Sequence, residues 1–255
     1  MTTIHHINCG SIQPAAGPRA SCHCLVLEGE DGLALVDAGI GLLDCRNADE
    51  RIGRALIDMV GFQFDEDDTA ARRIEALGFR AADVKHIVLT HCDPDHAGGL
   101  ADFPAATIHV AEEELASLRQ GNARYLPVQF IHGPNWKSYG ASSEDWFGLQ
   151  ARRVDLGSES RVLLVPLFGH TLGHCGVAIE QGDRWVLHVG DAYYLRVELD
   201  TDDHPVSQLA AQRADEDGLR RQSLQQLRRL AREHPDEIAM FGYHDFGEFP
   251  KSVKR

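Results

Sequence analysis

The sequence lacks the features that would direct a protein to a membrane or to nucleic acid. No apolar run reaches the roughly 20 residues that a membrane-spanning helix needs, and the N-terminus has no basic segment followed by an apolar stretch. The formal net charge is -14, and basic residues cluster only around Arg220 and Arg228. Because phosphate backbones attract basic surfaces, nucleic acid is not an expected partner. We therefore expect a soluble, cytoplasmic protein that binds neither membranes nor nucleic acid.

Disulfide bonds are not expected either. The six cysteines are scattered through a chain of 255 residues, which is too long to depend on cross-links for its stability. With 43% hydrophobic residues, the chain can bury a sizeable core. This size and composition fit one large domain, residues 1–255, better than two separate ones.

The feature that stands out is a cluster of polar residues directly after the apolar run 86–90. The hexapeptide His91-Cys92-Asp93-Pro94-Asp95-His96 contains two imidazoles and two carboxylates. Successive residues of a strand point to opposite faces, so these groups can face one place only if the chain turns, and Pro94 with Gly98-Gly99 supplies turn residues. Imidazole nitrogen and carboxylate oxygen are both ligands of borderline divalent ions. The cluster therefore predicts a metal-binding loop at the end of a strand.

Three further apolar runs end in similar residues. The run 162–168 leads into Gly169-His170-Thr171-Leu172-Gly173-His174, the run 185–189 leads to Asp191, and the run 237–241 leads to His244. The alternative to metal binding at these positions is a set of buried, hydrogen-bonded polar groups.

These motifs resemble those of the metallo-β-lactamase superfamily, whose signature is His-x-His-x-Asp-His followed at long range by a His, an Asp and a final His. His91, Asp95 and His96 match the signature, and Asp93 stands where the family usually has its second His. The resemblance covers nearly the whole chain and implies a four-layer αββα sandwich.

The resemblance also implies a set of metal ligands. One ion would be bound by His91, Asp93 and His170, the other by Asp95, His96 and His244, with Asp191 bridging the two. Zinc is the expected metal, although the harder carboxylate at Asp93 also suits iron or manganese. The alternative is that Asp93 is a solvated loop residue and the first site is weak or empty. Asp37, in Asp37-Ala38-Gly39, would lie under the metal site and orient a ligand by a hydrogen bond. His174 and His188 are expected either to support the metal ligands or to pack in the interior.

By the same resemblance the protein is a dinuclear metal-dependent hydrolase, in which a metal-bridging hydroxide attacks a lactone or related ester. Asp95 or Asp191 would take or relay the proton. Asp191-Ala192-Tyr193-Tyr194 is similar to the Asp-x-x-Tyr pattern of N-acyl-homoserine lactonases, so Tyr194 would stabilise the oxyanion; the alternative is a packed or exposed tyrosine. Alternative functions are an iron-dependent oxidoreductase of the persulfide dioxygenase type, a glyoxalase II-like thioesterase, and a ligand-binding protein without activity.

The segment 121–148 is rich in aromatic residues and is predicted to be an irregular insertion. Its aromatics would either form the wall of a pocket for a small-molecule substrate with an apolar portion, or pack against the domain. Elsewhere, the patterns predict a hairpin over 22–37, helices over 52–59 and 70–77 that cover the first sheet, and a helix over 219–230. A homodimer is compatible with the sequence.

Overall fold

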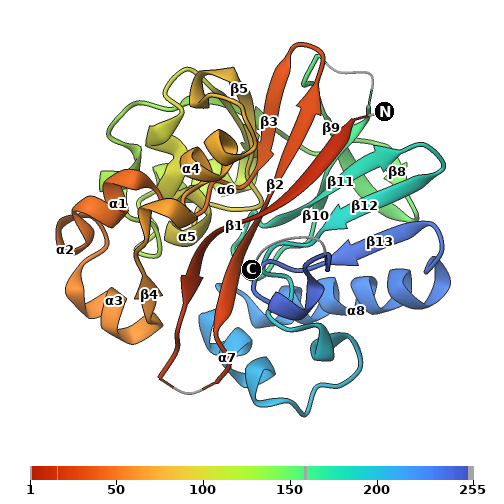
Figure 1. Ribbon diagram of the computed structural model, residues 1–255. Helices are drawn as coiled ribbons and strands as arrows, with labels where there is room; N and C mark the ends of the chain where they lie inside the picture. The colour runs from red at the N-terminus through yellow and green to blue at the C-terminus, as the bar shows by residue number, and fades with distance from the viewer. Residues whose placement is uncertain (1, 16, 158–159, 252–255) are drawn as a thin grey trace.

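The computed structural model describes residues 2–15, 17–157 and 160–251. Its strands form two sheets that pack face to face, and helices cover the outer side of each sheet (Figure 1). This is the four-layer αββα order that the sequence predicts.

The first sheet contains seven strands in the order β4-β1-β2-β3-β5-β6-β7. Its strands are β1 (Thr3–Ile12), β2 (Ala20–Gly29), β3 (Gly32–Val36), β4 (Phe62–Gln63), β5 (Val84–Val88), β6 (Thr107–Ala111) and β7 (Asn135–Tyr139). The antiparallel pair β2 and β3 is the predicted hairpin. Strands β3, β5, β6 and β7 run parallel, so their carboxyl ends, and the loop that follows β5, lie at one edge of the sheet.

The outer face of this sheet is covered by short helices (Figure 1). They are α1 (Leu42–Arg46), α2 (Ala48–Arg51), α3 (Arg54–Val60), α4 (Ala70–Ala76), α5 (Pro94–Ala97), α6 (Glu112–Arg119) and the 3-10 turns η1 (Glu66–Asp68), η2 (Ala81–Asp83), η3 (Gly98–Asp102) and η4 (Pro127–Phe130). The helix predicted over 52–59 is interrupted, because Gly53 has a φ of 88° and separates α2 from α3. Met59, near the end of α3, is 70% exposed, whereas Ile57 is the buried residue of this helix.

The second sheet contains six strands in the order β13-β12-β11-β10-β9-β8. Its strands are β8 (Glu144–Trp146), β9 (Leu149–Val154), β10 (Val162–Pro166), β11 (Cys175–Gln181), β12 (Arg184–His188) and β13 (Ile238–Phe241). Helices α7 (Pro205–Arg213) and α8 (Asp217–Glu233) lie near it, with the turns η5 (Arg196–Leu199) and η6 (Phe246–Glu248). The buried leucines of α8, Leu224, Leu227 and Leu230, pack in one cluster with residues of this sheet, as their spacing predicts.

Three of the four hydrophobic clusters among the described residues hold the layers together. One lies between the first sheet and its helices, and another lies between the second sheet and α8. The central core joins the two sheets, with Leu25, Val36 and Val88 on one side and Leu164 and Val177 on the other. The strand ends that carry the polar motifs are therefore fixed to a continuous apolar interior.

The aromatic segment 121–148 is not irregular throughout, as was predicted for this insertion, because it contains two strands. Residues Asn135–Tyr139 form β7, which pairs with β6 at the edge of the first sheet, and Glu144–Trp146 form β8 in the second. The aromatic side chains pack: Tyr125 and Trp136 join the outer core of the first sheet, and Trp146 joins that of the second. Of the two alternatives for these aromatics, the contacts support packing against the domain.

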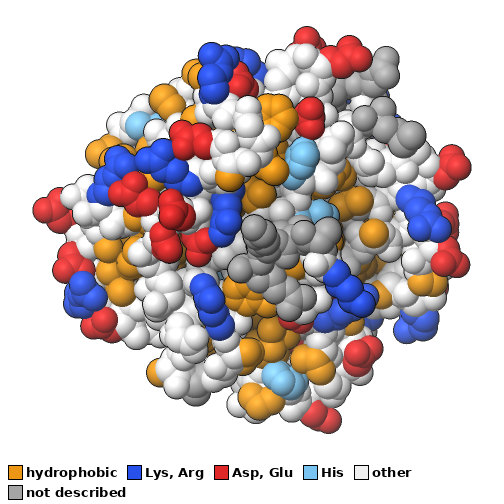
Figure 2. All heavy atoms as spheres, viewed as in Figure 1, with side chains coloured by type: hydrophobic (Ala, Val, Ile, Leu, Met, Phe, Trp, Pro, Cys, Tyr) orange, Lys and Arg blue, Asp and Glu red, His pale blue; other side chains and the backbone are white. Residues whose placement is uncertain are grey.

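The surface carries mixed charge. On the face shown in Figure 2, acidic and basic side chains alternate over α1 to α4, where Arg46 pairs with Glu66 and Arg72 with Glu75. All six cysteines are free thiols, five of them buried, as predicted. Along the described ranges, every helix falls short of the length and hydropathy that a membrane crossing requires.

Candidate metal centre

The loop after β5 turns its polar residues into the protein. Asp93 is the N-cap of the short helix α5, and Pro94 occupies its first turn, where proline is favoured because the missing N–H would have no partner. His91, Asp93, Asp95 and His96 are all at most 7% exposed. Four polar groups from six consecutive residues are thus buried together, as the sequence predicts.

The remaining predicted ligands come from loops of the second sheet. His170 lies in the connection from β10 to β11, Asp191 follows β12, and His244 follows β13. Gly169 has a φ of 125°, and a Cβ there would lie 1.9 Å from the backbone nitrogen of Arg220, so only glycine lets this loop pass so close to α8. The centre is therefore built at the edge where both sheets end.

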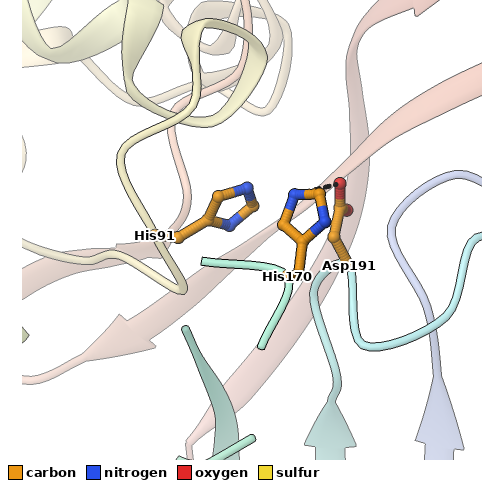
Figure 3. A group of neighbouring side chains, drawn as sticks. All are labelled: His91, His170 and Asp191. Carbon is orange, nitrogen blue, oxygen red and sulfur yellow. Dashed lines mark ion pairs between the residues drawn. The ribbon is translucent and has the colours of Figure 1, made fainter. Parts of the chain in front are cut away.

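The side chains gather in two groups. His91, His170 and Asp191 form one, shown in Figure 3 converging from three separate segments, and Asp95, His96 and His244 form the other. Within each group one ligand atom per residue lies within 4.8 Å of the others. We call these groups the first half and the second half of the centre.

Asp191 contacts both halves. Its Oδ2 is 3.4 Å from His170 Nε2 and 3.2 Å from His244 Nε2, and its Oδ1 is 3.3 Å from His96 Nε2. This is the position that a bridging carboxylate requires, between imidazoles of the first half and the second.

The donor set fits a divalent cation. Among the described residues, four buried atoms of the predicted ligands have no hydrogen-bond partner: His91 Nε2, His96 Nε2, His170 Nδ1 and Asp191 Oδ1. Buried polar atoms without partners are costly, and cations in the centre would supply partners for lone pairs among them. Burial lowers the pKa of His96, but Asp191, Asp37 and Asp95 outweigh it and raise that pKa well above its ordinary value. The carboxylates therefore attract positive charge to the imidazole.

Hydrogen bonds orient the imidazoles of the second half. Asp37 Oδ2 accepts from His96 Nδ1 at 2.8 Å, and both oxygens of Asp37 also accept from Thr90. His244 Nδ1 donates to the Ser21 carbonyl at 2.8 Å. Both imidazoles consequently direct Nε2 toward Asp191, and the bond from His96 to Asp37 is the contact that the predicted orienting role of Asp37 requires.

His174 and His188 bond to the backbone. His174 Nδ1 donates to the Leu167 carbonyl, and its Nε2 accepts from the Asp191 N–H at 3.0 Å. His188 Nε2 donates to the His23 carbonyl at 2.6 Å. Since both nitrogens of His174 are engaged, it holds the loop of Asp191 in place, and both residues support or pack as predicted.

Asp93 lies beside the first half and is not the solvated loop residue of the alternative interpretation, since it is only 5% exposed. Its Oδ2 is 3.4 Å from His91 Nε2 and 3.2 Å from His170 Nε2. Arg124 donates to it twice, from Nε to Oδ1 at 2.6 Å and from Nη2 to Oδ2 at 2.8 Å. Burial would raise the pKa of Asp93, but Arg124 and His91 outweigh it and hold that pKa well below its ordinary value.

Arg124 was not predicted as a residue of the site. It lies between α6 and η4 in the aromatic-rich segment, and no motif marks it. Glu114, on α6, was not predicted either: Oε1 accepts from the Cys92 N–H and the Tyr125 hydroxyl, and Oε2 from the Thr171 hydroxyl. Glu114 therefore ties the loop of His91 to the loop of His170.

Tyr194 lies across the two halves. Its ring meets His170 edge-on at a centroid distance of 5.8 Å and His244 at 5.3 Å. Burial, and then the charge of Asp191, raise the pKa of Tyr194 well above its ordinary value, so its hydroxyl keeps the proton at neutral pH. A protonated hydroxyl in this place can donate a hydrogen bond to a bound molecule.

The fold and the gathered His and Asp side chains match those of one known superfamily. The profile of the Metallo-beta-lactamase superfamily matches residues 17–242, and the chain belongs to this superfamily. The resemblance drawn from the motifs is thereby confirmed, and the His and Asp clusters indicate that the protein binds divalent metal.

Two named relatives align with most of the chain. A probable metallo-hydrolase of Mycobacterium tuberculosis, Rv2300c, is 45% identical over 203 residues, which are 77% of this chain and 64% of that protein. An N-acyl homoserine lactonase of Bacillus cereus is 28% identical over 176 residues, 68% of this chain and 64% of that protein. The chain thus spans less than two thirds of the length of these relatives.

Solved structures with this fold are also similar. An N-acyl homoserine lactone hydrolase with the product N-hexanoyl-L-homoserine at its catalytic metal centre has a TM-score of 0.74 at 22% identity, over 96% of this chain and 94% of the other. AidC, a dizinc quorum-quenching lactonase, has a TM-score of 0.58 at 18% identity, over 89% and 73%. At such identities the likeness shows the fold.

Proposed function

We propose that the protein is a metal-dependent hydrolase that opens a lactone or cleaves a related ester. The observation that carries this proposal is the convergence of His91, His170, Asp95, His96 and His244 on Asp191, with the ring of Tyr194 against both halves. Relatives and neighbours named as N-acyl homoserine lactonases support the choice of an ester bond in a ring, and their bound product supports a small-molecule substrate with an apolar chain.

The residues of the chain divide the reaction between them. Divalent cations in such a centre supply a hydroxide at neutral pH and polarise the carbonyl. The hydroxyl of Tyr194 donates a hydrogen bond to the carbonyl oxygen, where negative charge develops during attack. Asp191, or Asp95 beside it, accepts the proton of the attacking water and passes it to the leaving oxygen. Asp37 keeps His96 in the orientation that binding requires.

Zinc is the metal we propose. The carboxylate of Asp93 was the reason to consider iron or manganese, but its charge is already neutralised by Arg124. The remaining ligands, imidazoles with Asp95 and Asp191, form a set that zinc accepts. We also propose that residues 1–255 form one domain, which the continuous central core supports.

The proposal is tested by metal analysis and a lactone assay on the same protein. Protein purified without added metal is expected to contain zinc and to hydrolyse lactones or esters in a way that a chelator abolishes. Tyr194→Phe is expected to lower kcat/KM on the order of 100-fold without changing metal content, since one oxyanion donor is lost. Tyr139→Phe is the matched control, because that hydroxyl bonds to His109 away from the centre. Iron in the protein, with no hydrolysis, would point instead to an oxidoreductase.

A further inference from the structure

Arg124 is a buried cation placed at one half of a centre that already attracts cations. Its side chain is only 9% exposed, and its five N–H groups are all engaged. Two donate to Asp93, one donates from Nη2 to His170 Nε2 at 2.8 Å, and the two on Nη1 donate to the Arg213 carbonyl and to Asp215. A guanidinium with this complete set of partners is held in one orientation.

The partners of Arg124 are groups that a metal ion would use. The lone pair of His170 Nε2 that accepts from Arg124 is the lone pair that a cation would bind, and a nitrogen cannot do both at once. Both oxygens of Asp93 are likewise engaged by the guanidinium fork. A divalent cation at the first half would therefore compete with Arg124 for His170 Nε2, share Asp93 with it and lie beside a fixed positive charge.

The second half has no such competitor among the described residues. The ion pairs of Asp95 are with His96 and His244 alone. The Nε2 atom of His96 has no hydrogen-bond partner, and its Nδ1 is already fixed by Asp37. Asp191 lies 3.3 Å from His96 Nε2 and 3.2 Å from His244 Nε2.

We propose that Arg124 makes the two halves unequal: the second half, with Asp191, binds one divalent cation tightly, and Arg124 takes the place of the cation at the first half, so that a second ion binds only weakly. This inference rests on the proposed function in one respect, that the centre binds divalent metal. It assigns to Arg124 the neutralisation of Asp93 that a metal would otherwise supply.

The first experiment is a zinc titration of the full chain, made metal-free by dialysis against a chelator, with a competing indicator. The wild type is expected to bind one equivalent tightly and a second on the order of 100-fold more weakly. In Arg124→Met, which keeps the length of the side chain and removes its charge, the second equivalent is expected to bind at least ten times more tightly than in the wild type. Arg152→Met is the matched control: Arg152 is equally buried and pairs through both Nη atoms with Glu113, so its loss leaves the wild-type stoichiometry unchanged.

A second pair of variants tests the same point with Arg124 in place. His96→Ala is expected to lose the tight equivalent, whereas His170→Ala is expected to keep it. The number of zinc ions that these two variants bind tests the proposal even if Arg124→Met fails to fold.

The outcomes separate this inference from the proposed function. Two zinc ions of equal affinity in the wild type, or loss of the tight equivalent in His170→Ala, would overturn the role of Arg124 and leave the metal-dependent hydrolase intact. Failure to bind zinc, manganese or iron at either half would overturn both.

Discussion

The two halves of the centre contain the same kinds of ligand in different surroundings. The first half is closed: His91 is fully buried, His170 is 1% exposed, and a guanidinium is bonded to one of its imidazoles. The second half is more open, since Asp95 and His244 are each 7% exposed, and its imidazoles are fixed by Asp37 and by the Ser21 carbonyl. The comparison teaches that the number of ligands does not determine the number of ions, because neighbouring charges decide which ligand atoms are free.

Asp191 contacts imidazoles of both halves, so its loss should weaken metal binding at both. Asp191→Asn keeps the shape of the side chain and removes the charge that faces three imidazoles. Since losing a mere supporting residue costs about 10- to 100-fold in metal affinity, losing this ligand should cost at least about 100-fold at both halves, with hydrolysis falling in parallel. Elemental analysis after dialysis measures the effect.

The control for that variant is Asp102→Asn, which removes a carboxylate that accepts from the Leu42 N–H and belongs to neither ligand group. Its metal content should equal that of the wild type. Retention of wild-type metal by Asp191→Asn would show that the residue does not bridge.

Asp37 bonds directly to an imidazole of the second half and reaches His91 of the first half only through the Thr90 hydroxyl, so changing it should sharpen the comparison. Asp37→Asn fits the backbone, because φ is 57° at this position and asparagine tolerates the left-handed region. The amide cannot supply the negative charge that orients His96, so the tight equivalent should bind about 10- to 100-fold more weakly. Zinc titration measures this, and the weak equivalent should be unaffected. An equal loss at both halves would mean that Asp37 acts on the fold as a whole.

The fold and most of the centre could be predicted because their causes are local. Each apolar run becomes a buried strand, and a loop at the end of each strand carries the polar residues, so that the order of the motifs along the chain also orders them in space. These residues need only the strands to be placed correctly. The role of Asp37 is predicted differently, from the resemblance of Asp37-Ala38-Gly39 to the Asp-Thr-Gly loop of the superfamily.

The residues that distinguish the halves could not be predicted, because their contacts depend on tertiary structure. Arg124 lies in an irregular connection and reaches Asp93, 31 residues earlier in the chain, and His170, 46 residues later. Glu114 belongs to an acidic run at the start of α6. Carboxylates at this position normally face solvent and stabilise the N-terminal end of the helix. Strand β7, with sequence Asn-Trp-Lys-Ser-Tyr, has no β-branched residue, so its sequence shows little preference for a strand. It forms because its pairing with β6 overrides that weak local preference.

Glu114 supports only the first half, and its removal should have the smallest effect, on stability instead of metal binding. Burial raises the pKa of Glu114 to about 7, from the ordinary 4.5. Between these values the folded protein keeps a proton that the unfolded chain has lost, so the free energy of unfolding falls as pH rises. Glu114→Gln does not titrate, and an amide can serve the same three partners. From pH 6 to pH 7 the wild type should therefore lose about 1 kcal/mol of stability relative to this variant.

Denaturant unfolding of both proteins at the two pH values measures this difference, in which the titration of all other groups cancels. Glu113→Gln is the matched control on the same helix. Burial would raise the pKa of Glu113, but its pairing with Arg152 prevails and lowers that pKa, so Glu113 is charged at both pH values and the difference should stay constant. A constant difference for Glu114→Gln as well would mean that Glu114 is charged in the folded protein at pH 6. The loops of His91 and His170 would then be joined by a charged carboxylate. Its negative charge would lie beside the first half in addition to that of Asp93, with which Arg124 already pairs.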